Sequence, residues 1–595
     1  MPGYDLESLE LPKLVGLSLR LFAAALGHRA TRSLLLPSLL AQGGIHVLRA
    51  QRPGVDPTFY PGTCKPSVLS EVGVGREAGT PPHPLLTPAE VDAAVSSVPL
   101  SSGHAPAASD DSSPNAPGKA DASDAGTGPY VTIRDYAAAY GAGTATPLEV
   151  AGRVMDAIAA SEATTPPLRA IVATDREDVL AQARASAERY RAGRPLSRLD
   201  GVPVAIKDEL GQAPYPTFVG TSFLGKEPAA DSCCVARLRA AGALLIGKAN
   251  MYELGLDPSG CNPHNGTARN PHNPAHDPGG SSSGPAAAVA AGLCPVALGC
   301  DGGGSIRVPA ALCGVVGLKP TFGRVSEAGV FSLAPSVDAI GPIGATVADV
   351  AVAYGLIAGA DPADSRSLGQ PPVKLDGWSQ ADLRGLTLGL YAPWFRHAQP
   401  AVVETCEAMA RSLAQAGAKI VEIEVPGLNA MRIAHVVTIL SEIWANLQAH
   451  REHLGSLGAP ARVTLALADG FRAGDYLLAQ QVRTQAIATF EKVLAEVDCI
   501  ITPTTAITAP RIPVGGDPGG WSDLGATTEK MRFVFSANLT GHPAISFPAG
   551  YDAGGLPVGM QAIGRYWDEC TLLRVASAAE RGVVRRRPKI FFSPL

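Results

Sequence analysis

Two glycine- and serine-rich stretches contain residue types that can carry out serine-based chemistry. Residues 279–284 read Gly-Gly-Ser-Ser-Ser-Gly, and residues 301–305 read Asp-Gly-Gly-Gly-Ser. Three consecutive glycines leave the backbone N–H groups uncovered, so these groups can converge on one point. Donors fixed in this way stabilise a negative charge that develops on an oxygen atom. Ser305, at the end of the second stretch, is therefore a candidate nucleophile.

The second stretch is also compatible with two other kinds of loop. A Gly/Ser-rich loop can be a flexible connection, or it can bind a phosphate group. No Gly-Lys-Ser/Thr follows the glycines, which argues against a nucleotide-binding P-loop. The Gly-x-Ser-x-Gly order of the esterase nucleophile elbow is also missing, because Arg307 stands at its last position.

A serine nucleophile needs a base, and Lys207 is the best candidate in the sequence. It ends the apolar run 202–206, which has the composition of a buried strand. Burial would lower the pKa of its amino group and hold it neutral, so that it could accept a proton. A lysine at a strand end is also compatible with an ordinary surface charge. His264, His272 and His276 lie in an Asn/Pro-rich loop and are expected to be solvated turn residues.

Lys207 and the two loops together resemble the amidase signature family, whose hydrolases use a Ser–Ser–Lys triad, and their spacing fits the family pattern. The resemblance implies that Ser305 is the nucleophile, Ser281 the bridging serine and Lys207 the base. The implied oxyanion hole consists of the backbone amides of Gly302, Gly303, Gly304 and Ser305. A cis peptide bond before Ser281 is also implied. Cys300 stands where the family usually has Thr, and Pro285 where it usually has a small residue, but neither change removes a catalytic atom.

Other features are similar to the plant-type fatty acid amide hydrolases of this family. They are the Gly-Leu-Cys segment after the first serine loop, a long apolar N-terminal extension, and the segments 431–436 and 478–481. This resemblance implies hydrolysis of fatty acyl amides, such as N-acylethanolamines, without a metal or organic cofactor. It also implies a homodimer that associates peripherally with a cytosol-facing membrane, such as the endoplasmic reticulum or plasma membrane. The alternatives are a small-amide or carbamate hydrolase and the glutaminase-type component (the A subunit) of a tRNA amidotransferase.

The composition narrows the function classes further. The chain has 595 residues, of which 46% are hydrophobic, a net charge of −5 and a mean hydropathy of +0.12. A slightly acidic chain is not expected to bind nucleic acid. The 10 cysteines include no Cys-x-x-Cys pair, so we expect a reduced protein without a zinc site. No apolar run reaches the length of a membrane span.

The apolar segments alternate in a way that predicts an α/β fold. Strands near 202–206 and 243–246 alternate with helices, one of which begins at a capping box formed by Thr146 and Glu149. The resemblance implies that the sheet is large, mixed and twisted, with helices on both faces. The predicted parts are an N-terminal helical extension (1–60), an irregular linker (61–130) with a low-complexity insert (101–128), and the amidase signature catalytic domain (131–595).

The N-terminal extension is expected to form two short amphipathic helices. Leu14, Leu17, Leu21 and Ala25 recur at helical spacing, with Lys13 and Arg20 between them. Such helices could pack on the body of the protein, cap a substrate channel or lie on a membrane surface. The sequence leaves these three roles open.

Overall fold

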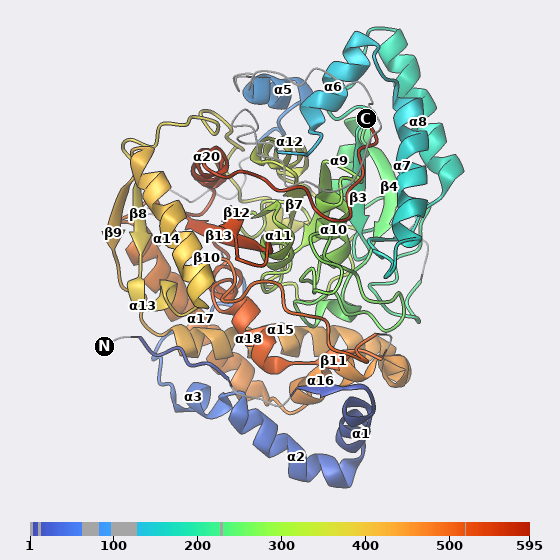
Figure 1. Ribbon diagram of the computed structural model, residues 1–595. Helices are drawn as coiled ribbons and strands as arrows, with labels where there is room; N and C mark the ends of the chain where they lie inside the picture. Colours follow the sequence, from blue (N-terminus) through green and yellow to red (C-terminus); the bar gives the residue numbers. More distant parts are fainter. Residues whose placement is uncertain (1–3, 10–12, 62–82, 97–127, 226–229, 518) are drawn as a thin grey trace.

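An eleven-stranded mixed sheet runs through the centre of the computed structural model (Figure 1). The structure describes residues 4–9, 13–61, 83–96, 128–225, 230–517 and 519–595. Across the sheet the strand order is β2-β4-β3-β5-β7-β6-β12-β13-β10-β8-β9. The strands are β2 (Ile171–Ala173), β3 (Pro203–Lys207), β4 (Leu244–Ala249), β5 (Val296–Cys300), β6 (Val316–Lys319), β7 (Ile340–Gly344), β8 (Thr387–Leu390), β9 (Lys419–Glu422), β10 (Cys499–Pro503), β12 (Ala544–Tyr551) and β13 (Pro557–Gly564). The predicted fold class is therefore confirmed.

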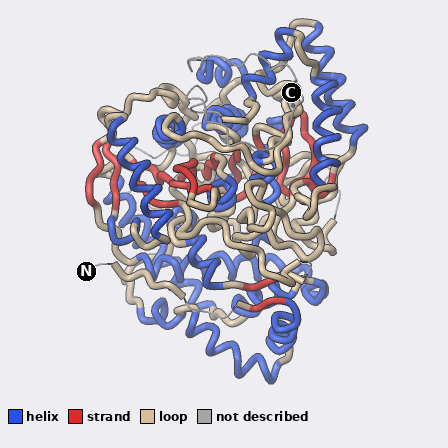
Figure 2. Tube along the Cα trace, viewed as in Figure 1, coloured by secondary structure: helices blue, strands red, loops and turns tan. Residues whose placement is uncertain are grey.

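Helices cover both faces of this sheet, as the colouring by secondary structure shows (Figure 2). The short helices that flank the two serine loops are α10 (Ser283–Ala290) and α11 (Arg307–Cys313). The longer helices of the α/β body are α6 (Ile133–Ala142), α7 (Pro147–Glu162), α8 (Arg176–Arg191), α9 (Cys233–Ala240), α12 (Val347–Ile357), α14 (Pro400–Gln415) and α20 (Glu569–Glu580). The predicted capping box of α7 is present, because Thr146 accepts from the amide of Glu149 and the Glu149 carboxylate accepts from Thr146.

The central strands bring two distant parts of the sequence to one edge of the sheet. β3 and β5 are parallel neighbours, with Val204 paired to Val296 and Ile206 to Leu298. Every residue of both strands is buried, which explains why they read as continuous runs of small and branched apolar residues. Parallel strands end at the same edge, so the end of β3 at Lys207 lies beside the end of β5 at Cys300.

Four helical segments lie together beyond this edge. They are α15 (Leu428–Asn446), η4 (Leu447–Ser456), α16 (Ala459–Ala468) and α17 (Ala473–Leu494). Two shorter helices, α18 (Leu524–Met531) and α19 (Phe535–Thr540), follow later in the chain. Residues 428–494 are therefore mainly helical.

The N-terminal extension forms three helices rather than the predicted two. They are α1 (Gly16–Gly27), α2 (Arg29–Gln42) and α3 (Ile45–Ala50). The buried face of α1 consists of Leu19, Ala23 and Leu26, which pack against α16. Leu17 and Leu21, which belong to the apolar face noted in the sequence, are 70% and 62% exposed, so this face does not pack on the protein. The helix has a second apolar face because it packs on α16 along a narrow stripe, whereas its apolar residues continue around its circumference.

Two further observations concern the N-terminal third. Within the stretch expected to be irregular, Pro88–Ser96 forms helix α5, which buries Val91 and Val95. The predicted low-complexity insert, 101–128, lies outside the described residues apart from Gly128. Within the described ranges, no helix combines the length and the apolar character that crossing a bilayer requires.

Candidate active site

Lys207 and Ser281 form a hydrogen bond at the edge of the sheet where β3 ends. Lys207 Nζ donates to Ser281 Oγ at 2.9 Å and to the carbonyl oxygen of Cys300 at 3.1 Å. Both side chains are buried, with 1% of each residue exposed. The peptide bond between Gly280 and Ser281 is cis, as the resemblance implied. The structure therefore brings together the predicted base and the predicted bridging serine.

Ser305 lies in the second serine loop, between β5 and α11, and its backbone joins that loop to the first. The amide of Ser282 donates to the carbonyl oxygen of Ser305 at 3.1 Å. The side chain of Ser305 lines a pocket. Among the described residues its hydroxyl makes no hydrogen bond, so its oxygen is available to a molecule in the pocket. The backbone contact places the hydroxyls of Ser281 and Ser305 on neighbouring loops.

The charge state of Lys207 differs from the prediction of a neutral amine. Burial alone would lower its pKa, but the carboxylate of Glu209 opposes this effect. Lys207 Nζ lies 2.8 Å from Glu209 Oε2, and Glu209 is equally buried. With smaller contributions from Cys300 and Asp338, the net result is a pKa above the ordinary value of lysine. Lys207 is therefore an ammonium in the resting structure.

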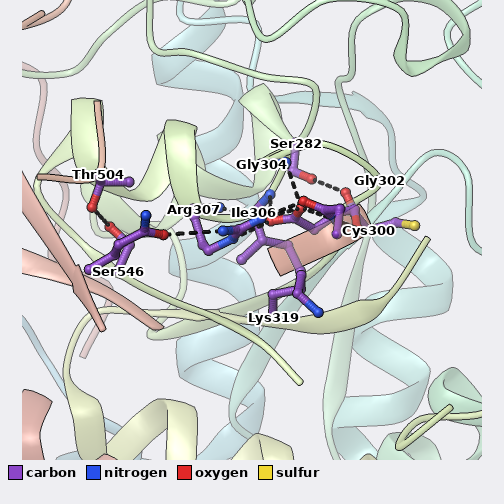
Figure 3. A network of polar contacts seen from close by, with 12 residues as sticks. Ser282, Cys300, Gly302, Gly304, Ile306, Arg307, Lys319, Thr504 and Ser546 are labelled. Atoms are coloured by element: carbon purple, nitrogen blue, oxygen red, sulfur yellow. Dashed lines mark hydrogen bonds and ion pairs between the residues drawn. The ribbon is translucent and has the colours of Figure 1, made fainter. Parts of the chain in front are cut away.

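The loop that carries Ser305 is held by a buried carboxylate, that of Asp301. Figure 3 labels three of the residues that bond to it, Gly304, Ile306 and Arg307. Asp301 accepts hydrogen bonds from the amide of Gly304 at 2.6 Å and from the amide of Ile306 at 3.0 Å. Arg307 donates to the same carboxylate from Nε and Nη2, each at 3.1 Å. Burial raises the pKa of Asp301, but Arg307 outweighs this and holds it well below the usual range. The carboxylate is thus a permanent anion at the base of the loop.

This arrangement corrects one predicted member of the oxyanion hole. The amide of Gly304 points to Asp301 Oδ1, so it does not face a substrate oxygen. Among the described residues, no hydrogen bond occupies the amides of Gly302, Gly303 and Ser305. These three donors fit an oxyanion, and Gly304 instead fixes the turn with a φ of +107°. A Cβ at Gly304 would lie 2.4 Å from Val534, which explains the glycine.

Residues far away in the sequence complete the support of the loop. Asn538 of α19 accepts from Arg307 Nη2 at 2.6 Å and donates to Asp301 Oδ1 at 2.9 Å. Gln561 of β13 accepts from Arg307 Nη1 at 3.1 Å. Sequence reasoning did not find Asn538, Gln561 or the role of Asp301, because no local motif marks an amide that is more than two hundred residues from its partner.

A largely apolar pocket leads away from Ser305. Gly303, Ser305 and Met531 lie at the loop, and α15 contributes one face along its length. The N-terminal extension also contributes, through Leu39 and Gln42 of α2 and through Leu9. The apolar side chains that line it are Leu9, Leu39, Leu256, Val436, Ile439, Leu440, Ile443, Leu467, Leu524, Met531 and Phe535. The N-terminal extension therefore forms part of the wall of this pocket.

Glu209, Cys300 and Asp338 form an acidic group behind Lys207. One ligand-type atom from each lies within 4.8 Å of the others, which is the spacing of a metal site. The ammonium of Lys207 already supplies a positive charge at 2.8 Å from Glu209. Burial, together with the neighbouring carboxylates of Glu209 and Glu327, raises the pKa of Asp338 well above its usual range. A neutral acid and a lysine-bound carboxylate are poor metal ligands, and within this group Glu209 is the counter-charge of Lys207.

The expectation of solvated histidines in the Asn/Pro-rich loop is wrong for one of them, His272. His272 is 6% exposed, and burial lowers its pKa to about 4. His264 is exposed, and its Nε2 lies 2.5 Å from Oε1 of Glu253, a buried residue. These contacts explain the histidines as parts of the loop structure, and none of them reaches Lys207.

Comparison with known proteins identifies relatives over most of the chain. A model of the Amidase family matches residues 154–573. A fatty acid amide hydrolase from Medicago truncatula is 43% identical over 478 residues, which are 78% of this chain and 79% of that protein. The A subunit of a glutamyl-tRNA(Gln) amidotransferase from Chloroflexus aggregans is 38% identical over 483 residues, covering 76% of this chain and 96% of that protein.

Solved structures give the same result for the fold. The native peptide amidase from Stenotrophomonas maltophilia superposes with a TM-score of 0.65 at 31% identity, covering 77% of this chain and 98% of that one. A bacterial aryl acylamidase of the amidase signature family superposes with a TM-score of 0.68 at 27% identity, covering 76% and 96%.

Proposed function

The chain belongs to the amidase family, and from this premise we propose that it hydrolyses fatty acyl amides, such as N-acylethanolamines, to a fatty acid and an amine. Its kinship with fatty acid amide hydrolases supports an amide-hydrolysing enzyme. The observation that carries the choice of a lipid substrate is the pocket at Ser305. Its lining is mainly apolar, and part of it comes from the N-terminal extension. A long acyl chain fits such a lining, because burying it removes apolar surface from water.

In the proposed mechanism Ser305 Oγ attacks the amide carbonyl carbon. Its proton passes to Ser281, and the proton of Ser281 passes to the neutral form of Lys207, with which it shares a hydrogen bond. The amides of Gly302, Gly303 and Ser305 stabilise the negative charge that develops on the carbonyl oxygen. The C–N bond breaks as the relay returns the proton to the leaving nitrogen. Water then hydrolyses the acyl ester on Ser305 by the reverse relay.

The relay requires contact between the hydroxyls of Ser281 and Ser305. Catalytic hydrogen bonds are often loose without substrate and tighten in the complex. The backbone bond from Ser282 to Ser305 keeps the two loops in contact. In the proposed mechanism the Ser305 hydroxyl turns toward Ser281 when substrate is bound. Lys207 must also lose its proton before it can act, which requires alkaline pH or a transfer to Glu209.

Peripheral membrane association is part of this proposal. Leu17 and Leu21 of α1 and Leu34 of α2 are 70%, 62% and 78% exposed, on two adjacent helices of the extension that also lines the pocket. Exposed leucines beside a lipid-binding pocket fit contact with a bilayer surface. Co-sedimentation with phosphatidylcholine vesicles tests this, and a triple Leu→Ser variant should stay in the supernatant. The expected homodimer also stays a proposal, which sedimentation velocity would test.

The experiment for the reaction is hydrolysis of a series of ethanolamides, from acetyl to long unsaturated acyl groups. We expect kcat/KM to rise with chain length and Ser305→Ala to abolish turnover without loss of fold, whereas Ser282→Ala should retain activity. A preference for acetyl amides would favour a small-amide hydrolase. Glutaminase activity that appears only with partner proteins would favour the tRNA amidotransferase component, whose relatives are also similar to this chain.

A further inference from the structure

One face of α15 lines the pocket, and its character changes along the helix. The apolar part consists of Val436, Ile439, Leu440 and Ile443. Arg432 and His435 lie nearer the N-terminus of the helix. Residues three and four apart share one face of a helix, so all six line the same cavity. Arg432 and His435 are one turn apart. They form a polar end in an otherwise apolar wall.

The side chain of Arg432 has an unused donor. Arg432 is 8% exposed, and its Nη2 donates to Asn429 Oδ1 at 3.0 Å. Its Nε is buried and has no acceptor among the described residues. Burial lowers the pKa of Arg432 to about 10, an effect that the carboxylates of Glu7 and Asp5 oppose, so the guanidinium stays charged near neutral pH.

The side chain of His435 has an unused acceptor. Its Nε2 lies 2.8 Å from the carbonyl oxygen of Gly302, and a carbonyl can only accept, so Nε2 carries the hydrogen. Burial lowers the pKa of His435 to about 4, so the ring is neutral at pH 7 and Nδ1 has a free lone pair. Nδ1 is buried and has no donor among the described residues. An unpaired buried polar atom costs about 1–3 kcal/mol, so a ligand that pairs with it gains affinity.

Both side chains line the pocket that contains Ser305 and Gly303 of the oxyanion loop. The oxyanion loop touches α15 at two places, since a Cβ on Gly303 would lie 2.9 Å from His435 and a Cβ on Gly302 would lie 3.2 Å from Ile439. The carbonyl held by this loop therefore lies between the polar and the apolar parts of the helix. An acyl chain that follows the apolar part leaves the amine half of the substrate facing Arg432 and His435.

We propose that Arg432 and His435 form a subsite for a hydroxyl group on the amine half of the substrate. A hydroxyl is the small group that satisfies both atoms, because its oxygen accepts from Arg432 Nε–H and its hydrogen is donated to His435 Nδ1. The subsite selects N-(2-hydroxyethyl) amides, whose hydroxyl is two carbons from the scissile nitrogen, over amides with an alkyl group of the same size. This inference rests on the proposed hydrolysis of fatty acyl amides.

The test compares two amides of the same long-chain acid, the N-(2-hydroxyethyl) amide and the N-propyl amide, which has a methyl group in place of the hydroxyl. We expect the full-length enzyme to prefer the hydroxyethyl amide by about tenfold or more in kcat/KM, which corresponds to one satisfied buried hydrogen bond. Arg432→Met should reduce this ratio to below about three. Arg462→Met is the matched control, because Arg462 of α16 also has an unpaired buried Nε but does not line the pocket.

The outcomes separate this inference from the proposed function. Equal rates on the two amides in the unmodified enzyme, or a ratio that Arg432→Met leaves unchanged, would overturn the hydroxyl subsite while the lipid amidase stands. A ratio that falls equally in Arg462→Met would also overturn it. If the enzyme hydrolyses neither long-chain amide but is active on short ones, the proposed lipid substrate itself fails.

Discussion

Lys207 Nζ lies 2.8 Å from Glu209 Oε2, in a contact that buries both charges at the end of strand β3. A buried lysine without a partner would lose its proton, but here the adjacent carboxylate raises its pKa. The group proposed as the base is therefore held in its acid form at rest. This relationship makes the pH dependence of the reaction a direct probe of the Lys207–Glu209 pair.

Replacing the acid of this pair should move the pH profile in a defined direction. The unmodified enzyme is expected to gain activity as pH rises, because the active form contains neutral Lys207. In Glu209→Gln the counter-charge is lost, burial dominates, and the pKa of Lys207 falls, so the rising limb of kcat/KM should shift to lower pH by one unit or more, that is, about 1.4 kcal/mol or more. Activity measured on one substrate between pH 6 and 10.5 checks this.

The control for this experiment is a substitution at another charged group near Glu209. Asp338, Glu327, Cys300, Asp208 and Lys248 all act electrostatically on it or on its neighbours. Asp208 is adjacent to Glu209 in sequence but pairs with Lys248, at 3.9 Å, and accepts from the amide of Gly220. Asp208→Asn should thus lower the free energy of unfolding and leave the rising limb of the pH profile of kcat/KM in place. A limb that stays fixed in Glu209→Gln would contradict the assignment of Glu209 as the partner of Lys207.

The carboxylate of Asp301 is predicted to control both the rate and the stability. Asp301→Asn leaves the buried guanidinium of Arg307 without its counter-charge, which should cost about 3–5 kcal/mol of unfolding free energy. It also weakens the bonds to the amides of Gly304 and Ile306, so kcat should fall about 10²–10³-fold as the oxyanion donors lose their positions. Steady-state kinetics and thermal unfolding measure the two effects.

A second substitution separates the two roles of Asp301. Adding Arg307→Met to Asp301→Asn removes the unpaired charge, so the double variant should regain part of the stability. The rate should not recover, because the loop still lacks its anion. If kcat recovered along with stability, the fall in rate would be a consequence of misfolding and not of loop position.

The parts of the site that consist of contiguous sequence motifs could be predicted from the sequence. The two glycine–serine loops and Lys207 are contiguous motifs, and the alternation of buried strands with helices is visible without the structure. The position of Glu209 could not be derived from strand alternation, because β3 ends at Lys207 and residues 208 and 209 form a turn, closed by the hydrogen bond from the amide of Leu210 to the carbonyl oxygen of Lys207. Its effect on the lysine depends on the absence of solvent, which only the folded chain shows.

Other parts could not be predicted, because packing between distant elements creates them. His435 touches Gly302 although 133 residues separate them, and a single histidine on an apolar helix gives no sign of such a contact. Packing also decides which face of α1 is buried. Its residues are apolar almost all round, so only the position of α16 decides that Leu19 is buried and Leu17 is exposed.

Lys319 at the end of β6 is predicted to reduce stability at neutral pH. It is 1% exposed, and burial, aided by the charge of Arg307, lowers its pKa to about 7 from 10.5. Between pH 7 and pH 10.5 the unfolded chain binds a proton at Lys319 that the folded chain does not, so the unfolding free energy rises with pH. The loss of stability caused by burying the charged lysine is therefore greatest below pH 7. Lys319→Met should raise the melting temperature, most at low pH, and flatten its rise between pH 7 and 10.

A second buried lysine provides the contrast for this prediction. Lys530 is 2% exposed, but its Nζ lies 3.1 Å from Asp277 Oδ2. The carboxylates of Asp277 and Asp257 outweigh the effect of burial and raise the pKa of Lys530. Lys530→Met should lower the melting temperature, since it leaves a buried carboxylate unpaired. If Lys319→Met were equally destabilising at pH 7, the bond from Lys319 to the carbonyl of Pro320 would be worth more than the burial of its charge costs.

Leu39 of α2 offers a test of whether the N-terminal extension forms part of the acyl pocket. Leu39 lines the cavity, whereas Leu34 on the same helix is 78% exposed. Leu39→Ala removes apolar surface that a long acyl chain would contact, so kcat/KM for long-chain amides should fall about tenfold while the acetyl amide is unaffected. Leu34→Ala should change neither value when the substrates are presented in detergent. Equal losses on the acetyl and long-chain amides in Leu39→Ala would show that α2 supports the fold of the site and does not contact the acyl chain.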